Sequence, residues 1–143
     1  MTVASILAAK GRIVATTNAT RTIGEAVDEL AERRIGALVV VDGVDRVVGI
    51  ISERDIVKAL ARTGARVLAD PVGTIMTRDV VTCAETETVI GVMTRMTRGR
   101  FRHLPVVKGG RLAGIISIGD VVKERIGEVE READEMRSYI ATA

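Results

Sequence analysis

The heptapeptide GIISERD at residues 49–55 returns as GIISIGD at residues 114–120. The similarity extends upstream, because Thr22 and Thr88 begin matching segments that lie 66 residues apart. The spacing falls to 65 residues at the heptapeptides, and the change lies at glycine-containing turns, which tolerate differences in length. A repeat of this period indicates two structural units with one fold.

Each unit is predicted to fold in the order strand, helix, strand, strand, helix. The helices show apolar residues every three to four positions, whereas the strands are short runs of β-branched and apolar residues. In the first unit these segments are residues 13–16, 22–34, 38–41, 47–51 and 52–62. The second unit repeats the order over residues 80–126, and a short helical segment precedes each unit. The predicted fold class is therefore α/β of the α+β type, with two βαββα units in tandem.

A longer helix is predicted after the second unit, because its apolar positions step by three and four residues. These positions form a heptad-like seam of Val122, Ile126, Val129, Ala133, Met136 and Ile140. The seam is expected to be buried either against its own domain or against a second copy of the chain, and both alternatives stay open. We divide the chain into a first domain at 1–69, a second at 70–126 and a C-terminal helical extension at 127–143.

The composition narrows the class of protein. With 143 residues, 47% of them apolar, the chain can bury a real core. A single cysteine, Cys83, and a single histidine, His103, exclude an internal disulfide and a structural zinc cluster. The sequence shows neither a signal-peptide pattern nor an apolar run of about 20 residues, so we expect a cytoplasmic protein without a membrane partner.

The duplicated unit resembles a known family. Two βαββα units, each with a glycine, two apolar residues, a serine, two variable residues and an aspartate, look like a pair of CBS domains, called a Bateman module. The resemblance covers roughly residues 1–126 and includes FRHLPVV at residues 101–107, which is similar to a characteristic strand of the family's second unit. It implies two units packed through their sheets about a pseudo-twofold axis. It also implies two clefts that bind adenosine-containing ligands, without catalysis.

The repeated aspartate and serine are the candidate ligand contacts. Asp55 and Asp120 fall in the first turn of a helix, where a carboxylate can accept hydrogen bonds from both hydroxyls of a ribose. Ser52 and Ser117 precede them by three residues and can reach a phosphate oxygen or a ribose hydroxyl, beside helix amides that favour an anion. The same spacing is also a helix cap, so capping alone is the alternative role.

The resemblance implies that each cleft is closed by the opposite unit. Thr16, Gly36 and Ala37 would close the cleft of the second aspartate, and Thr82 would close the cleft of the first. The adenine would lie between apolar strand residues. The expected contacts along the strands are Val14, Leu38, Val80, Leu104 and Pro105.

Basic side chains are expected to meet the ligand's phosphates. Arg102 and His103 would carry charge into the module, with Arg54 beside its aspartate. The first unit has Gly36 and Ala37 where the second has Arg102 and His103, so the two clefts should differ. One could hold a mononucleotide and the other a larger dinucleotide, and the choice among AMP, ADP, ATP, NAD(H) and S-adenosylmethionine stays open.

The sequence favours a sensor over two other functions. An arginine-rich stretch at residues 95–102 makes a nucleic-acid-binding protein the alternative, but its charges alternate and only Phe101 and Tyr139 are aromatic. No nucleophile with a positioned base appears, so neither catalysis nor a catalytic cofactor is expected. We therefore predict a stand-alone adenine-nucleotide sensor, a homodimer that acts in trans on an unknown protein target, with no nucleic-acid partner.

Overall fold

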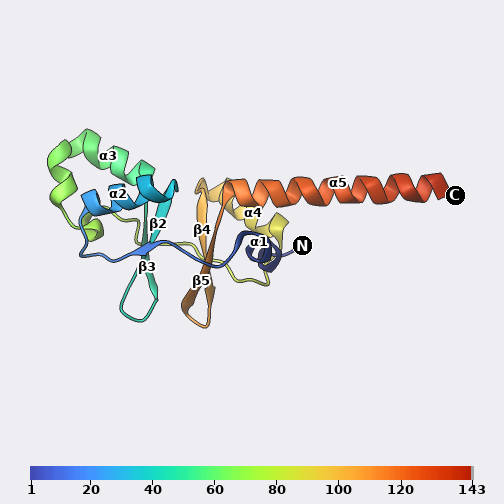
Figure 1. The fold of residues 1–143 in the computed structure, drawn as a ribbon, viewed down its shortest axis with the longest axis horizontal. Coiled ribbons are helices and arrows are strands. Elements are labelled where there is room, and N and C mark those ends of the chain that lie inside the picture. The colour runs from blue at the N-terminus through green and yellow to red at the C-terminus, as the bar shows by residue number, and fades with distance from the viewer. Residues whose placement is uncertain (143) are drawn as a thin grey trace.

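The computed structural model describes residues 1–142 and confirms a mixed α+β fold (Figure 1). Five helices, five strands and two short 3-10 segments are found in this part of the chain. In chain order they are α1 (Val3–Lys10), β1 (Thr16–Thr17), α2 (Ile23–Arg33), β2 (Ala37–Val41), β3 (Val47–Ser52), α3 (Glu53–Thr63), η1 (Ala65–Ala69), η2 (Val72–Thr74), α4 (Val89–Gly99), β4 (His103–Lys108), β5 (Arg111–Ser117) and α5 (Ile118–Thr142). β1 pairs in parallel with β2, which pairs antiparallel with β3, while β4 and β5 form an antiparallel pair.

The first strand of each unit is shorter than predicted. In the first unit only β1 forms, where we expected residues 13–16. In the second unit the expected strand is reduced to an isolated parallel bridge between Cys83 and Val106. The Val80 N–H donates instead to the Arg78 carbonyl at 2.9 Å, so a local turn takes a backbone group that a strand would need. β-branched residues alone do not form a strand where the backbone has few hydrogen-bond partners on the neighbouring strand.

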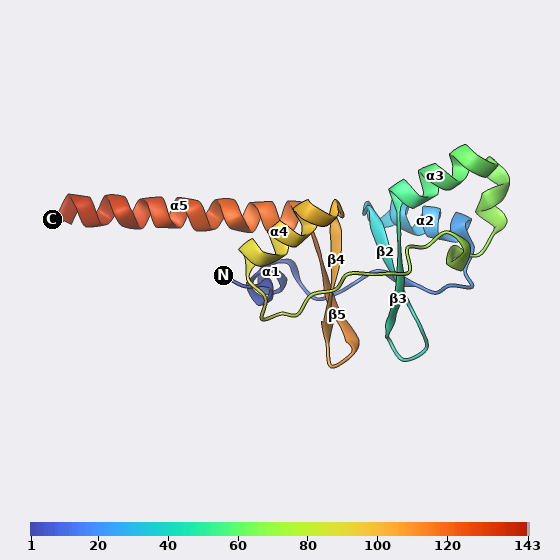
Figure 2. The same ribbon diagram turned by 180° about the vertical axis from the view of Figure 1, so that it is seen from behind.

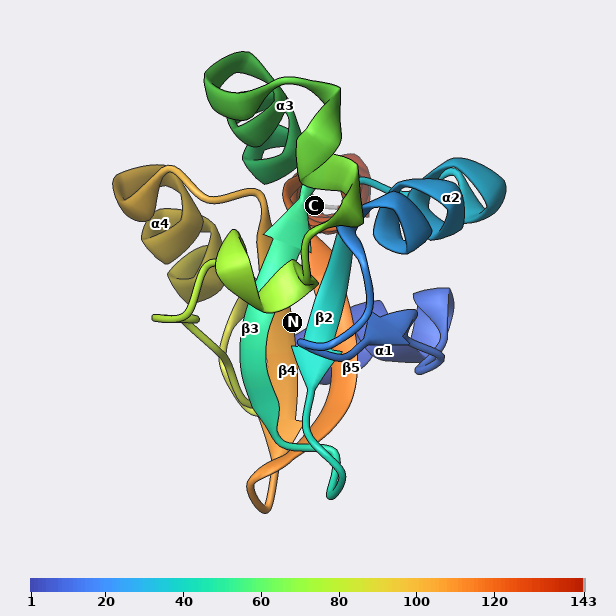
Figure 3. The ribbon, with the colours of Figure 1, turned by 90° about the vertical axis from the view of Figure 1, so that its left-hand side faces the viewer.

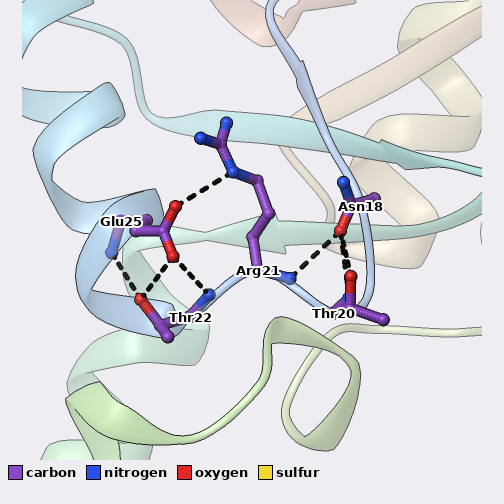
Figure 4. A network of polar contacts seen from close by, with 5 residues as sticks. All are labelled: Asn18, Thr20, Arg21, Thr22 and Glu25. Carbon is purple, nitrogen blue, oxygen red and sulfur yellow. Dashed lines mark hydrogen bonds and ion pairs between the residues drawn. The ribbon is translucent and has the colours of Figure 1, made fainter.

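Polar contacts hold the start of α2 (Figure 4). Thr22 Oγ1 accepts a hydrogen bond from the Glu25 N–H at 3.1 Å, and the Glu25 carboxylate accepts one from the Thr22 N–H at 3.3 Å. Arg21 Nε donates to the same carboxylate at 3.0 Å. Asn18 Oδ1 accepts from the N–H groups of Thr20 and Arg21 and closes the turn after β1. This capping box fixes where the helix begins.

The two sheets face each other in the middle of the molecule. Figure 1 shows α2 and α3 outside one sheet and α1, α4 and α5 outside the other, and Figure 3 shows one sheet behind the other. Leu38 and Val40 belong to the first unit's core, while Val39 between them is fully buried outside both core clusters. Because neighbouring strand residues point to opposite faces, Val39 points from the first sheet toward the second. The predicted packing of the units through their sheets is therefore seen.

The segment before each unit packs on the other unit. Val3, Ile6 and Leu7 of α1 lie in the core formed by α4, β4, β5 and α5. Val72 and Met76, which precede the second unit, lie in the core of the first. The division at residues 69 and 70 describes the sequence repeat and stays a prediction, but the packed cores cross it.

We call this packing of each preceding segment on the other unit the crossing of the segments. The glycine of each repeated heptapeptide leaves space for the crossing segment. A Cβ atom at Gly114 would lie 2.7 Å from Leu7 Cδ2, and a Cβ atom at Gly49 would lie 2.6 Å from Met76 Sδ. Both distances are far below van der Waals contact. A residue with a side chain at either position would therefore push the crossing segment away from the sheet.

α5 extends well beyond the second unit (Figures 1 and 2). It is one continuous helix of 25 residues, of which only Val121 is buried among those described. The apolar seam predicted along it does not fold back on its own domain, because five of its residues are exposed. They are Val122 (41%), Ile126 (53%), Val129 (48%), Met136 (61%) and Ile140 (68%). No helix in residues 1–142 has both the length and the apolar character needed to cross a membrane.

The glycine contact gives a stability prediction. Gly114→Val is expected to lower the free energy of unfolding by about 1–3 kcal/mol, because the new side chain overlaps Leu7. Urea unfolding followed by circular dichroism measures this loss. Gly43→Val is the matched control, since a Cβ at Gly43 meets nothing within 4 Å. Equal stability of the two variants would contradict the crossed packing at Gly114.

Candidate functional site

A cavity of about 530 Å³ lies between the two units and is called the inter-unit cavity below. Its lining combines the end of α1, the segment before β1, the start of β2, and residues of β4 and β5. The lining residues are Lys10, Ile13, Val14, Ala15, Arg33, Ile35, Gly36, Ala37, His103, Ile115 and Ser117. The volume suits a small organic ligand, and contacts from both units mean that a ligand here would bridge them.

Asp120 lies beside this cavity at the start of α5. Its Oδ2 accepts hydrogen bonds from the Ser117 N–H at 2.8 Å and from Lys10 Nζ at 2.6 Å. Lys10 Nζ also donates to the Ile115 carbonyl at 3.0 Å. Burial alone would raise the pKa of Asp120, but the hydrogen bonds from Lys10 and Ser117 outweigh it, so the pKa lies below its usual value. The carboxylate is therefore ionised at neutral pH.

The two oxygens of Asp120 have different roles. Oδ2 caps α5 and holds Lys10, while Oδ1 has no hydrogen-bond partner within residues 1–142. A carboxylate offers about four acceptor positions, so capping and ligand binding are compatible at one side chain. The arrangement shows the capping role directly and leaves an acceptor free for a ribose hydroxyl.

Asp55, the equivalent residue in the first unit, has different surroundings. Its Oδ2 accepts from the Ser52 N–H at 2.9 Å and from Ser52 Oγ at 3.0 Å, and its Oδ1 accepts from Thr77 Oγ1 at 3.4 Å. At the spacing that relates Leu7 to Met76, the counterpart of Lys10 is Asp79, an acid. The cavity beside Asp55, of about 380 Å³, is lined by α3, η1, η2 and adjacent residues of the first unit. It does not include the predicted Val80 and Thr82.

Several predicted residues meet in the inter-unit cavity. Gly36 and Ala37 come from the first unit, Ser117 and His103 from the second, and Val14 from the segment that joins α1 to β1. The His103 ring lies over Gly36, where a Cβ atom would be 3.4 Å from His103 Cε1. The predicted closing of the second aspartate's cleft by Gly36 and Ala37 agrees with this placement, although their role in binding stays a prediction.

Other predicted contacts lie elsewhere. Leu38 and Leu104 are fully buried in the two cores and do not line the inter-unit cavity, and their contact with adenine stays a prediction. In each strand the neighbouring residue faces the cavity instead, because side chains alternate between the two faces. Pro105 is buried in β4, and Thr16 lies by a separate polar pocket with Asn18.

The basic lining also differs from the prediction. Arg102 is exposed and does not line the inter-unit cavity, whereas Lys10 and Arg33 do. Arg54, predicted beside Asp55, is exposed and does not line the cavity there. Lys10 could not be found from the repeated motif, because it belongs to the crossing segment α1. Arg95 is held by Glu87 and by the carbonyl of Thr82, so the arginine-rich stretch is partly paired within the unit.

The single cysteine, Cys83, is shielded from solvent. Cys83 is buried, and burial raises the pKa of its thiol to about 12, so it is not a nucleophile at neutral pH. Within the described part of the chain, no three acidic, histidine or cysteine side chains cluster to hold a metal ion.

His103 is a titratable residue of the cavity wall. Burial is the main cause that lowers its pKa, and the positive charges of Lys10 and Arg102 lower it further. Glu53 and Asp120 act in the opposite direction but do not outweigh burial. His103 is therefore neutral at pH 7 and can accept or donate a hydrogen bond at the cavity.

This lowered pKa predicts a pH dependence of stability. As the pH falls from roughly 7 to 5, through the unfolded pKa of about 6.5, the unfolded chain binds a proton before the folded one does. The free energy of unfolding should therefore decrease over this range. Urea unfolding at several pH values should show a flatter curve for His103→Gln, since the sequence has no other histidine. If the free energy of unfolding of this variant fell with pH as steeply as that of the wild type, groups other than His103 would cause the pH dependence.

Comparison with known proteins places the chain in a family. The CBS domain family model matches residues 11–62 and 72–127. A protein of Acidianus ambivalens is 46% identical over 103 residues, which are 71% of this chain and 61% of that protein. A mitochondrial CBS domain-containing protein of Arabidopsis thaliana is 35% identical over 123 residues, which are 83% of this chain and 60% of that protein. The chain thus spans about three fifths of the length of these curated relatives.

Solved structures agree with this match. A CBS-domain-containing protein from Agrobacterium tumefaciens is 50% identical with a TM-score of 0.84, over 87% of this chain and 99% of that chain. A CBS domain pair in complex with 5′-methylthioadenosine and S-adenosyl-L-methionine is 32% identical with a TM-score of 0.80, over 90% and 98%. A CBS domain protein from Pyrobaculum aerophilum complexed with AMP is 33% identical with a TM-score of 0.75, over 84% and 89%. The chain therefore belongs to the CBS domain family, as a tandem pair of CBS domains.

Proposed function

We propose that this CBS domain pair is a non-catalytic sensor that binds an adenine nucleotide in the inter-unit cavity. The observation that carries the proposal is that residues of both units line this cavity. Basic side chains of Lys10 and Arg33 line it, and the ionised carboxylate of Asp120 lies beside it. Support also comes from the related structures that hold AMP, 5′-methylthioadenosine or S-adenosyl-L-methionine. All three ligands contain adenosine.

The ribose would bind at the start of α5. Oδ1 of Asp120 faces no competing donor among the described residues and could accept from the ribose hydroxyls. Each such bond to a charged acceptor contributes about 1.5–3 kcal/mol. The adenine would then lie against Val14, Ala37 and Ile115, where contact is apolar and backbone groups can read its edge.

The charge of the lining favours a phosphorylated ligand. Lys10 and Arg33 both line the cavity, and Asp120 is already paired with Lys10. Arg33 bonds Glu29 through Nε at 2.7 Å, and an arginine has further N–H donors suited to phosphate. We therefore place AMP, ADP, ATP and NAD(H) ahead of S-adenosylmethionine, whose sulfonium would meet two cations.

Ligand binding would be converted into a change in how the two units sit together. Lys10 holds α1 to the start of α5, and an incoming phosphate would compete with Asp120 for its ammonium group. A ligand shifts such an equilibrium in proportion to its differential affinity for the two states. The proposal includes a homodimer that signals in trans to a protein target in the cytoplasm.

The position of the inter-unit cavity predicts which of the two aspartates contributes to nucleotide binding. In a thermal-shift titration, adenine nucleotide at 100 times its dissociation constant should add about 2.7 kcal/mol of stability to the wild-type protein. Asp120→Asn is expected to weaken binding roughly 10- to 100-fold, because the ribose loses a charged acceptor while the cap keeps its shape. Asp55→Asn is the matched control and should bind as wild type, since Asp55 lies outside the inter-unit cavity and both of its carboxylate oxygens already accept hydrogen bonds.

The ligand panel should contain AMP, ADP, ATP, NAD(H), S-adenosylmethionine, guanine nucleotides and a short oligonucleotide. Wild-type affinity in Asp120→Asn would show that this carboxylate only caps α5. Protection by the oligonucleotide alone would replace the sensor with a nucleic-acid-binding function. Protection by S-adenosylmethionine but not by the nucleotides would keep the sensor and overturn the preference for phosphate.

A further inference from the structure

The seam of α5, defined as Val122, Ile126, Val129, Ala133, Met136 and Ile140, is an apolar surface without a partner in its own chain. Its five large residues are 41–68% exposed, over a helix that extends past the rest of the unit (Figure 2). A contiguous exposed stripe of this kind marks an interaction surface. Most of the stability of a helix in a protein comes from packing of its apolar face, so burial of the stripe would also stabilise α5.

The seam is on a different side of α5 from the contacts with its own unit. Val121 is the buried residue of the helix, and the ammonium group of Met1 pairs with Glu128 at 3.5 Å. Each residue turns the helix by about 100°, so Val121 and Glu128 share one face and the seam is centred roughly a quarter turn away. A second helix can therefore reach the seam without displacing α1 or α4.

The charges beside the seam favour a parallel arrangement of two copies. With Ile126 at a heptad a position, Arg125 and Glu132 occupy g positions, and Glu130 and Arg137 occupy e positions. In a parallel pair, each g residue faces the e residue of the partner's next heptad. Arg125 would then face Glu130 of the partner subunit, and Glu132 would face Arg137 of the partner subunit. Every one of these contacts joins opposite charges, and twofold symmetry makes each occur twice.

These residues are free to make such contacts. Arg125 bonds Glu128 at 3.0 Å and Arg137 bonds Asp134 at 3.1 Å, each through Nη1, which leaves other guanidinium donors. Neither Glu130 nor Glu132 forms an ion pair among the described residues. Their negative charges therefore have no partner along α5 itself.

An antiparallel arrangement is less favourable. Full overlap of the seam would place Glu130 against Glu130, and Glu132 against Glu132, of the other copy. Like charges at these positions are destabilising. An overlap shortened by one heptad would avoid this conflict, but it would leave Met136 and Ile140 uncovered.

We propose that two copies of this chain pair through the α5 seam as a parallel two-stranded coiled coil. The inference deepens the homodimer of the proposed function and does not depend on which ligand binds. Asp120 caps the same helix that forms the coil, so each ligand site would lie at the base of the dimer contact. A change at Asp120 would then reach the partner through one continuous helix.

Disulfide trapping of the full chain tests the direction of the pair. Met136→Cys should give a disulfide-linked dimer under mild oxidation, because parallel pairing places the two Met136 positions side by side. Ser138→Cys, on the opposite side of α5, is the matched control and should stay unlinked. The wild-type chain should also stay unlinked, since Cys83 is buried. Antiparallel full overlap would place Met136 opposite Ile126, roughly 15 Å from its own counterpart.

Charge exchange tests the same pairing without a covalent bond. Glu132→Arg and Arg137→Glu should each weaken the dimer roughly tenfold in sedimentation equilibrium, and the double variant should restore it. The coiled coil would be overturned, and the homodimer kept, by a dimer with two properties. Its Met136→Cys variant would form no disulfide, and its Glu132→Arg, Arg137→Glu double variant would not regain wild-type affinity. A wild-type monomer at all concentrations tested would overturn both, and leave ligand binding to be judged by the thermal-shift panel.

Discussion

The crossing of the two segments that precede the repeats is the constraint on which the rest of the structure depends. Leu7 packs where Gly114 has no side chain, and Met76 packs in the same way at Gly49. Each unit thus completes its core with a segment from before the other repeat, so neither core is complete without the other half of the chain. This arrangement joins the units by apolar burial, the dominant favourable contribution to folding.

The crossing also creates the difference between the two aspartates. α1 carries Lys10 to Asp120, which forms an ion pair at the edge of the inter-unit cavity. The matching position before the second repeat holds Asp79, an acid, and Asp55 receives only hydroxyl and backbone donors. Two copies of one motif therefore have unlike electrostatic surroundings, because the residues that surround each copy come from outside the motif.

Much of the fold could be predicted because the repeated segments carry strong local signals. Thr22 with Glu25, and Ser52 with Asp55, form the capping boxes that their spacing predicts. The hairpins could be predicted from continuous apolar runs. The burial of Leu38 and Leu104 in the cores could not be predicted, because a run that is apolar at every position does not reveal which residues face the core.

The sequence by itself determined the duplication, the order of the elements, the helix starts and the apolar seam of α5, because each depends on residues close together in the chain. Only the tertiary structure decided which unit's core contains α1, which aspartate forms an ion pair and which strand residues line the inter-unit cavity. Those features depend on contacts between distant residues, such as Lys10 and Asp120, and no local periodicity encodes them. Tertiary packing alone brings such residues within hydrogen-bond distance.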